Sequence, residues 1–439
     1  MNPANTNEMN TRPSAAPRSV SSIPSTRPRV YRWLRVALVG IGLSLPIPCC
    51  AQSDWLDKLD QALAVESANG FFRSDLSALL DFEGYYIDQN PPGLLFPDDD
   101  FFFNPRLSLF LDTRVGKRLY SLVQVRVDRG FDPGAKPDGD ARFDEYFLRY
   151  TPFDEPVINF QVGKFATVIG NWIARHDSWN NSFITTPAPY ENVTIITDHA
   201  VPVSVENFLA RKSSPDKKQT WLPIIWGPSY ATGGSVFGLI DKFDYAFELK
   251  NASLSSRPYA WDADTIGWEY PTVSGRVGYK PNATWSVGAS GSHGAYLLPP
   301  AEAALPAGTT LGSFMQTTVG TDVRWAWRHW QVFAEAYASR FEMPFVGDAD
   351  TLAYYLETKY KLTPRCYVAA RWNQQFFDEI RTDTGALEPW DRDLWRVDTA
   401  VGYRFDRHLQ AKLQYSYSHQ KGSLQQGEQL VAAQLTLKF

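Results

Sequence analysis

The sequence predicts an all-β fold, a transmembrane antiparallel β-barrel of about 16 strands with a long inward-folded loop. Three observations carry this prediction. Apolar and polar residues alternate with a period of two from Phe71 onward, and short turns alternate with long polar links. The composition joins 44% hydrophobic and 14% aromatic residues to a mean hydropathy of only −0.31. A barrel with an apolar, lipid-facing exterior and a polar lumen has this pattern and composition.

The chain begins with a leader that we exclude from the fold. Residues 1–26 are rich in Pro, Ser, Thr and Asn, and we expect them to be unstructured or to result from an upstream start codon. Residues 27–51 join four arginines to a short apolar run and small residues, which predicts a signal peptide cleaved after Ala51. A lipoprotein signal at Cys49 or Cys50 is the alternative.

Removing this leader changes the charge and the cysteine count. It contains six Arg, one Glu and two of the three Cys, which leaves 37 basic and 47 acidic residues, a net charge of −10, and the single Cys366. An intramolecular disulfide is therefore excluded, and the charge argues against a nucleic-acid partner. No later stretch reaches the roughly 18 apolar residues of a membrane helix. We therefore expect an exported protein of the bacterial outer membrane, with membrane lipid as its surroundings.

Residues 52–69 precede the alternating region and predict a short periplasmic helix. Trp55, Leu56, Leu59 and Leu63 fall on one side of a helix that runs from Trp55 to Ala68. We expect this helix to lie at the periplasmic mouth of the barrel as a spacer or plug.

Residues 70–439 form the predicted barrel, because their alternation matches strands that face lipid on one side and water on the other. In one early strand Leu107, Leu109 and Leu111 alternate with Arg106, Ser108 and Asp112. In the last strand the apolar face consists of Val431, Ala433, Leu435, Leu437 and Phe439. Most strands are about ten residues long, the length that a tilted strand needs to cross the hydrocarbon layer.

The connections discriminate a membrane barrel from its main alternative, a soluble β-sandwich. Short turns are predicted at residues 116–118, 152–156, 241–242, 281–282, 328–329, 363–365 and 406–407. Long links are predicted at residues 89–102, 130–140, 255–269, 297–312, 343–350, 378–391 and 420–426. A sandwich has no reason to keep this asymmetry. Aromatics near the strand ends also suit interface girdles: Tyr120, Tyr150, Trp268, Trp285, Trp330, Trp372 and Trp395.

Residues 166–230 break the alternation and are the candidate constriction or plug region. So long a loop is usually functional, and a barrel of this size can admit it into the lumen. The predicted constriction residues are the charged groups in and beside it: Lys164, Arg175, His176, Asp177, Glu191 and Asp198. The aromatics Trp172, Trp179 and Tyr190 would either contact a sugar or aromatic solute or pin the loop to the wall.

Two sequence features resemble a known family of bacterial outer-membrane porins, those related to the phosphate-selective type. They are Gly163-Lys164-Phe165 before the long loop and the terminal Phe439. The resemblance implies a porin, a homotrimer, and a C-terminal Phe439 that the barrel assembly machinery reads. Phosphate selectivity is not carried over, because the predicted lumen face mixes arginines with acids: Arg106, Arg126, Arg149 and Arg324 with Asp112, Asp128, Glu145 and Asp322.

We therefore expect an outer-membrane porin that allows passive diffusion of ions or small polar solutes. The alternative is a plugged barrel that acts as an enzyme or as an export or structural component. Arg175-His176-Asp177 and Asp198-His199 contain acid and base side chains, with Ser178 and Ser182 nearby. Neighbouring His and Asp side chains point apart in an extended segment, however, and no nucleophile elbow is present. No catalytic site, metal site or cofactor is predicted.

Overall fold

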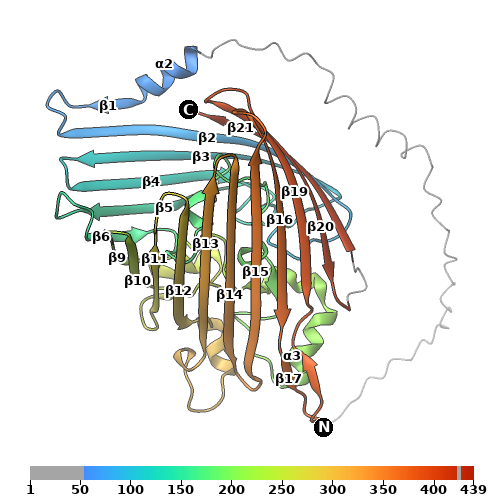
Figure 1. The fold of residues 1–439 in the computed structure, drawn as a ribbon. Helices are drawn as coiled ribbons and strands as arrows, with labels where there is room; N and C mark the ends of the chain where they lie inside the picture. The colour runs from blue at the N-terminus through green and yellow to red at the C-terminus, as the bar shows by residue number, and fades with distance from the viewer. Residues whose placement is uncertain (1–53, 423–426) are drawn as a thin grey trace, which may run out of the picture. The chain divides into compact units, whose positions relative to one another are not determined.

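The computed structural model describes residues 54–422 and 427–439, whose long strands form a closed antiparallel barrel (Figure 1). The sheet closes because β2 pairs with β3 on one edge and with β21 on the other. The barrel strands, 16 within the described ranges, are β2 (Phe72–Ile87), β3 (Phe101–Val115), β4 (Leu119–Asp128), β5 (Asp140–Tyr150), β6 (Asn159–Lys164), β9 (Thr232–Ile240), β10 (Phe243–Lys250), β11 (Thr272–Tyr279), β12 (Trp285–Ala295), β13 (Met315–Trp327), β14 (Trp330–Met343), β15 (Gly347–Lys361), β16 (Cys366–Phe377), β19 (Leu394–Arg404), β20 (Leu409–Gln420) and β21 (Gly427–Lys438). The predicted fold class is confirmed.

The predicted alternation separates an outer apolar face from an inner polar one, as β15 shows. Leu352 and Leu356 are 44% and 50% exposed on the outside, whereas Ala353 and Glu357, the residues that follow them, are both 0% exposed on the inside. An exposed band of Leu, Val, Phe and Trp side chains would be unfavourable in water. It fits the hydrocarbon layer of a bilayer, so this face is the lipid-facing surface.

The asymmetry of the connections is confirmed with one exception, the predicted long link at residues 343–350. There β14 ends at Met343, β15 begins at Gly347, and these two residues are paired. Asp348 and Asp350 are strand residues whose carboxylates contact Arg340, with N–O distances of 3.0 and 2.7 Å. The prediction of a loop at residues 343–350 is therefore wrong. Its polar residues extend the two strands and form ion pairs across them.

One predicted girdle aromatic, Tyr120, faces the lumen instead of the lipid. Its hydroxyl donates a hydrogen bond to Asp112 and its ring lies 5.3 Å from the Arg149 guanidinium carbon, so polar lumen partners hold it inside. Trp372 and Trp395 lie on the outer face, where their rings stack in parallel with centroids 5.5 Å apart.

The N-terminal helix α2 (Asp54–Ala62) is shorter than the predicted helix from Trp55 to Ala68. It ends early because the next residues form β1 (Ala64–Glu66), which pairs with the start of β2. Asp57 of α2 contacts His408, beside the turn between β19 and β20, at 2.6 Å. The helix therefore lies at the short-turn end of the barrel. Among the described residues, no helix is both long and apolar enough to span a membrane.

The links between barrel strands contain short elements. The longest link, residues 165–231 between β6 and β9, is called the inward segment below. It contains η1 (Ile173–Arg175), η2 (Ala188–Tyr190), β7 (Val193–Thr194), α3 (Val205–Ala210), η3 (Arg211–Ser213), η4 (Pro215–Thr220) and β8 (Leu222–Pro223). The other links contain η5 (Pro258–Trp261), α4 (Ala263–Ile266), η6 (Pro299–Ala304), η7 (Leu311–Ser313), β17 (Glu379–Arg381) and β18 (Leu387–Pro389).

Candidate functional site

The inward segment leaves the barrel wall at a glycine that no other residue could replace without strain. Gly163 has a φ of +140°, and an added Cβ would lie 2.2 Å from the carbonyl oxygen of Tyr146 on β5. β6 pairs with β5 only up to Lys164 opposite Tyr146. The glycine of the Gly-Lys-Phe triplet thus allows the close β5–β6 contact after which the chain turns away from the wall.

The first part of the inward segment is anchored to β14 by a buried carboxylate, Glu335. One of its oxygens accepts hydrogen bonds from the backbone N–H groups of Asn171 and Trp172, at 2.6 and 2.7 Å. The other accepts from the hydroxyls of Tyr190 and Tyr337. A side chain at Gly170 would not fit beside this cluster, because its Cβ would lie 2.2 Å from the Tyr337 hydroxyl.

A second anchor joins Arg175 of the segment to Glu357 of β15. Arg175 donates from both terminal nitrogens to the two carboxylate oxygens, at 2.7 and 3.2 Å, and its guanidinium lies over the ring of Phe333. The side chains of Arg175 and Glu357 are only 11% and 0% exposed. Because the pair is buried and bidentate, its charges are compensated within the protein.

Polar side chains of β16 and β20 hold the middle of the segment. Asn373 accepts from the backbone N–H of Ala188 at 3.0 Å, and Gln414 accepts from that of Ile184 at 2.6 Å. Gln375 accepts from the side-chain amide of Asn192 at 2.7 Å. All three wall residues have the lumen-facing parity of their strands. The inward segment therefore lies inside the lumen, against the wall that contains β14 to β20.

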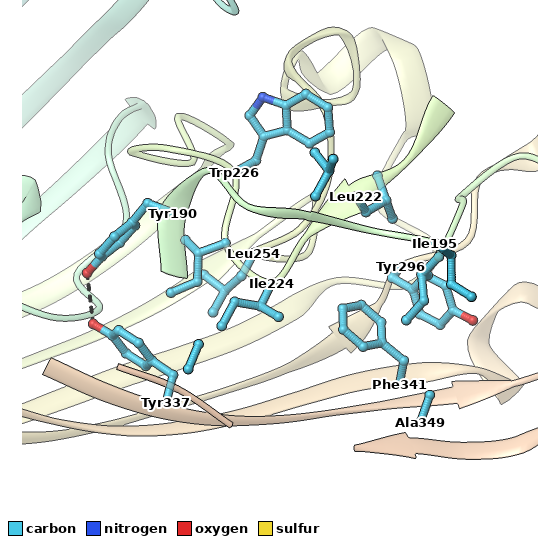
Figure 2. Packing of buried hydrophobic residues seen from close by; sticks show 14 of the residues in the cluster. Tyr190, Ile195, Leu222, Ile224, Trp226, Leu254, Tyr296, Tyr337, Phe341 and Ala349 are labelled. Atoms are coloured by element: carbon cyan, nitrogen blue, oxygen red, sulfur yellow. Dashed lines mark hydrogen bonds between the residues drawn. The ribbon is translucent and has the colours of Figure 1, made fainter. Parts of the chain in front are cut away.

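An apolar core forms between the segment and this wall, as Figure 2 shows. Ile195, Leu222 and Ile224 of the segment pack with Tyr296 from the β12–β13 link and with Phe341 of β14. Each of these five side chains is at most 1% exposed. The lumen is thus filled on one side by a structure with its own hydrophobic core, which is more than a peptide hydrogen-bonded to the wall.

A cavity of about 360 Å³ remains between the segment and β2–β5. We call it the passage cavity. The wall and the segment both contribute charged side chains to its lining. Those of the wall are Asp81, Arg106, Arg126, Glu145 and Lys438, and those of the segment are Asp177 and Glu191, with His176 beside them. Leu94, Leu95 and Asp132 from the long links also line it.

The structure brings three of the six predicted site residues together in this cavity: His176, Asp177 and Glu191. Asp177 accepts hydrogen bonds from the backbone of Trp179 and Asn180, at 2.9 and 2.8 Å. Among the described residues it has no cationic partner. Glu191 by contrast forms an ion pair with Arg396 of β19.

The other three predicted residues lie elsewhere. Arg175 is held by Glu357, as described above. Lys164 is buried and contacts Asp262, beside α4, at 2.8 Å. Asp198 is fully buried at the long-link end, where it accepts from Arg257 at 2.6 Å and contacts His199 at 3.0 Å.

Of the three predicted aromatics, two are buried in the apolar core and one is partly exposed. Trp172 and Tyr190 are 3% and 0% exposed in the apolar core, with ring centroids 4.7 Å apart. Trp179 lines the passage cavity, and the Arg404 guanidinium lies 4.5 Å from its ring centre. Trp172 and Tyr190 also border this cavity, but they are buried, so Trp179 is the most exposed of the three predicted aromatics.

Burial dominates the electrostatics of the segment and its neighbouring links. It lowers the pKa of His176, whose ring nitrogens contact the Ile173 carbonyl and the Tyr230 hydroxyl. It raises the pKa of Asp132 to about 7, although Trp226 donates a hydrogen bond to that carboxyl group. It lowers the pKa of Lys218 to about 8, and this ammonium donates to the carbonyl oxygens of Pro91 and Leu95.

Several residues that organise the site could not be selected from the sequence. Glu335, Asn373 and Gln414 occupy lumen-facing positions, which the alternation does indicate. Nothing in one strand shows which segment its polar residues will meet, because their partners are about 160 to 230 positions away in sequence. Asp132 and Lys218 gave no signal beyond their charge.

The chain matches no family model, and no curated protein sequence is similar to it. Solved structures share its fold at low identity. OmpT of Vibrio cholerae is 12% identical, with a TM-score of 0.52 over 86% of this chain and 99% of that one. The anion-selective porin from Comamonas acidovorans is 10% identical, with a TM-score of 0.54 over 84% and 100% of the two chains. OmpF of Salmonella typhi, in complex with daunomycin, gives 10% and 0.54 over 85% and 100%.

At these identities the similarity establishes the fold. Together with the lipid-facing band and the closed barrel of 16 described strands, it defines a porin-like β-barrel of the bacterial outer membrane.

Proposed function

We propose that this barrel is a porin through which ions or small polar solutes diffuse passively along the passage cavity. The observation that carries the proposal is the one-sided filling of the lumen. The inward segment packs against β14 to β20 and leaves a cavity lined by charged side chains beside β2 to β5. A narrow, charge-lined passage of this kind filters solutes by size and by charge.

Asp177 is the residue on which the filter depends most in this proposal. The wall arginines of the cavity are compensated, Arg106 by Asp81 and Glu83 and Arg126 by Asp144. Asp177 has hydrogen-bond donors but no cationic partner among the described residues. It therefore adds negative charge to a lining that has five carboxyl groups, its own included, against the three cations Arg106, Arg126 and Lys438, and this balance favours cations.

The test is the single-channel current of the refolded protein in a planar bilayer under a KCl gradient. We expect stable ohmic steps, and we expect Asp177→Asn to move the reversal potential toward lower cation preference. Asp138→Asn is the matched control, because Asp138 is an exposed acid in the β4–β5 link and does not line the cavity. An identical shift in both variants would sink the assignment of the filter to Asp177.

The alternative, a plugged barrel with an enzymatic, export or structural role, has one observation in its favour, the extent of the apolar core. Its enzymatic form has less support. In the described part of the chain, neither His176 nor His199 is hydrogen-bonded to a serine hydroxyl. A barrel that is folded by heat-modifiable gel mobility, yet silent in repeated bilayer insertions, would favour the plugged alternative.

We also propose that the barrel is a homotrimer and that Phe439 is read by the barrel assembly machinery. Phe439 extends the β21 pairing, with backbone hydrogen bonds to Ala78 in both directions at 2.5 and 3.1 Å. Sedimentation of the detergent-solubilised protein tests the trimer. Export of a Phe439→Ser variant, compared with Leu437→Ser on the same strand face, tests the recognition of the terminal aromatic.

A further inference from the structure

A second cavity lies at the short-turn end of the barrel, beside the passage cavity. Its volume is about 590 Å³, and the turn at residues 363–365 contributes to its lining. Trp179 and Asn180 line both cavities, so this part of the inward segment separates them. We call it the lower cavity.

The lower cavity is strongly basic. Eight of its lining side chains are Arg or Lys, and Asp244 is the one carboxylate among them. Two further carboxylates, Asp322 and Glu357, pair with lining arginines from just outside. Even with Arg365 left out of the count, the seven other cations exceed these three carboxylates by four. The rest of the chain is acidic overall, so this concentration of positive charge is local.

Four of the lining cations have no carboxylate partner. Within the described residues, no ion pair with an acid is formed by Arg324, Lys359, Lys361 or Arg404. Other arginines in the lumen do form ion pairs with acidic residues. Arg142 contacts Asp128 at 2.7 Å, and Arg371 contacts Asp398 at 2.8 Å.

Aromatic rings hold two of these four cations in place. The Lys359 ammonium lies 3.9 Å from the ring centre of Tyr367, and the Arg404 guanidinium lies 4.5 Å from that of Trp179. Both rings line the lower cavity. A ring face orients a cation but does not neutralise it, so the charge stays available to an anion.

We propose that the lower cavity binds a small anion that carries two or more negative charges. Inorganic phosphate and polycarboxylates share this chemistry. Several uncompensated cations around one water-accessible space concentrate anions, and a multivalent anion contacts more than one of them at once. The site lies beside the passage cavity, and binding there does not require the passage to conduct.

The test is titration calorimetry of the full chain, refolded in an uncharged detergent, with sodium citrate at constant ionic strength. We expect saturable citrate binding that the double variant Arg324→Gln, Lys361→Gln weakens about tenfold or more, because two nearby positive charges are lost. Both side chains are exposed, so their replacement leaves the packing intact. Lys117→Gln with Lys242→Gln removes the same charge from two exposed turn residues outside the cavity, and we expect wild-type affinity from it.

The charge-preserving pair Arg324→Lys, Lys361→Arg completes the design, and we expect it to retain citrate affinity. Absence of saturable binding by the wild-type chain, or equal losses in the two glutamine pairs, would overturn the proposal. Conduction without citrate binding would leave the porin proposal standing alone. Citrate binding by a chain that is silent in bilayers would leave only the anion site.

Discussion

The apolar core and the passage cavity place charged groups in different surroundings. Beside the core, on the side of β14 to β20, Arg175 and Glu357 are buried and paired with each other. On the side of β2 to β5, charged groups face an open cavity, and Asp177 is among them. Arg175 and Asp177 are only two positions apart in sequence, yet they have different roles. The first stabilises the inward segment, and the second is placed to act on a solute.

The largest expected effect tests the filled side. Arg175→Ala leaves the Glu357 carboxylate buried and unpaired, which we expect to cost about 3–5 kcal/mol of unfolding free energy. Urea unfolding of the refolded barrel measures this. Arg340→Ala is the matched control, because Arg340 forms a bidentate pair with Asp350 at the surface, where loss of an ion pair has little effect. Equal losses in the two variants would remove the contrast between the filled side and the surface.

A smaller effect tests the point where the chain leaves the wall. Gly163→Ala places a Cβ against the Tyr146 carbonyl at a positive φ, and we expect it to cost about 2–4 kcal/mol. Gly84→Ala on β2 is the control, because an added Cβ would meet no atom within 4 Å. Thermal unfolding compares the two. If Gly163→Ala is as stable as the control, the glycine is not what allows the close β5–β6 contact.

Per pH unit, the smallest of the three effects is a pH dependence of stability that arises from a residue of the passage cavity, Asp132. Asp132 has a folded-state pKa of about 7, compared with an ordinary value of 3.8, because it is buried. Between these values the folded state keeps a proton that the unfolded state has released. The contribution of Asp132 to stability is therefore greatest at acidic pH and is lost as the pH rises to about 7, by at most about 1.4 kcal/mol per unit.

Asp132→Asn removes this titration and keeps an oxygen that can accept the Trp226 N–H. Melting curves from pH 4 to pH 8 should therefore be flatter for this variant than for the wild type. Asp138→Asn, in the same link but exposed, should keep the wild-type slope. A wild-type slope in Asp132→Asn would show that Asp132 is not the group responsible.

Much of the barrel could be predicted from the sequence because lipid and water impose opposite demands on neighbouring residues. The alternation alone predicts that Leu352 and Leu356 face lipid and that Glu357 faces the lumen. The prediction of a loop at Asp348 and Asp350 was wrong. Acidic residues are typical of loops, and the sequence does not show that both pair with Arg340 on the neighbouring strand. Tyr120 was misplaced for a related reason, because an aromatic with a hydroxyl suits a girdle and a polar lumen equally well.

The candidate site was less predictable than the wall, because it depends on which side of the lumen the inward segment packs against. The sequence identified a long segment with charged residues, and three of the six are together in the passage cavity. It could not show that Glu335 and Glu357 would capture the Arg175 end of the segment. The position of the segment depends on contacts between residues far apart in sequence, and no local sequence pattern reveals these contacts. The same position determines which charged side chains face water.

The seam between β2 and β21 has a consequence for the time course of folding. Its paired residues, such as Leu80 and Leu437, are separated by nearly the whole barrel sequence, so this contact carries a large loop-closure cost. All other neighbouring barrel strands follow one another along the chain, with a single link between them. We therefore expect the sheet to grow hairpin by hairpin and the joining of β2 to β21 to come last. Until that contact forms, both edge strands are open to pairing with other chains.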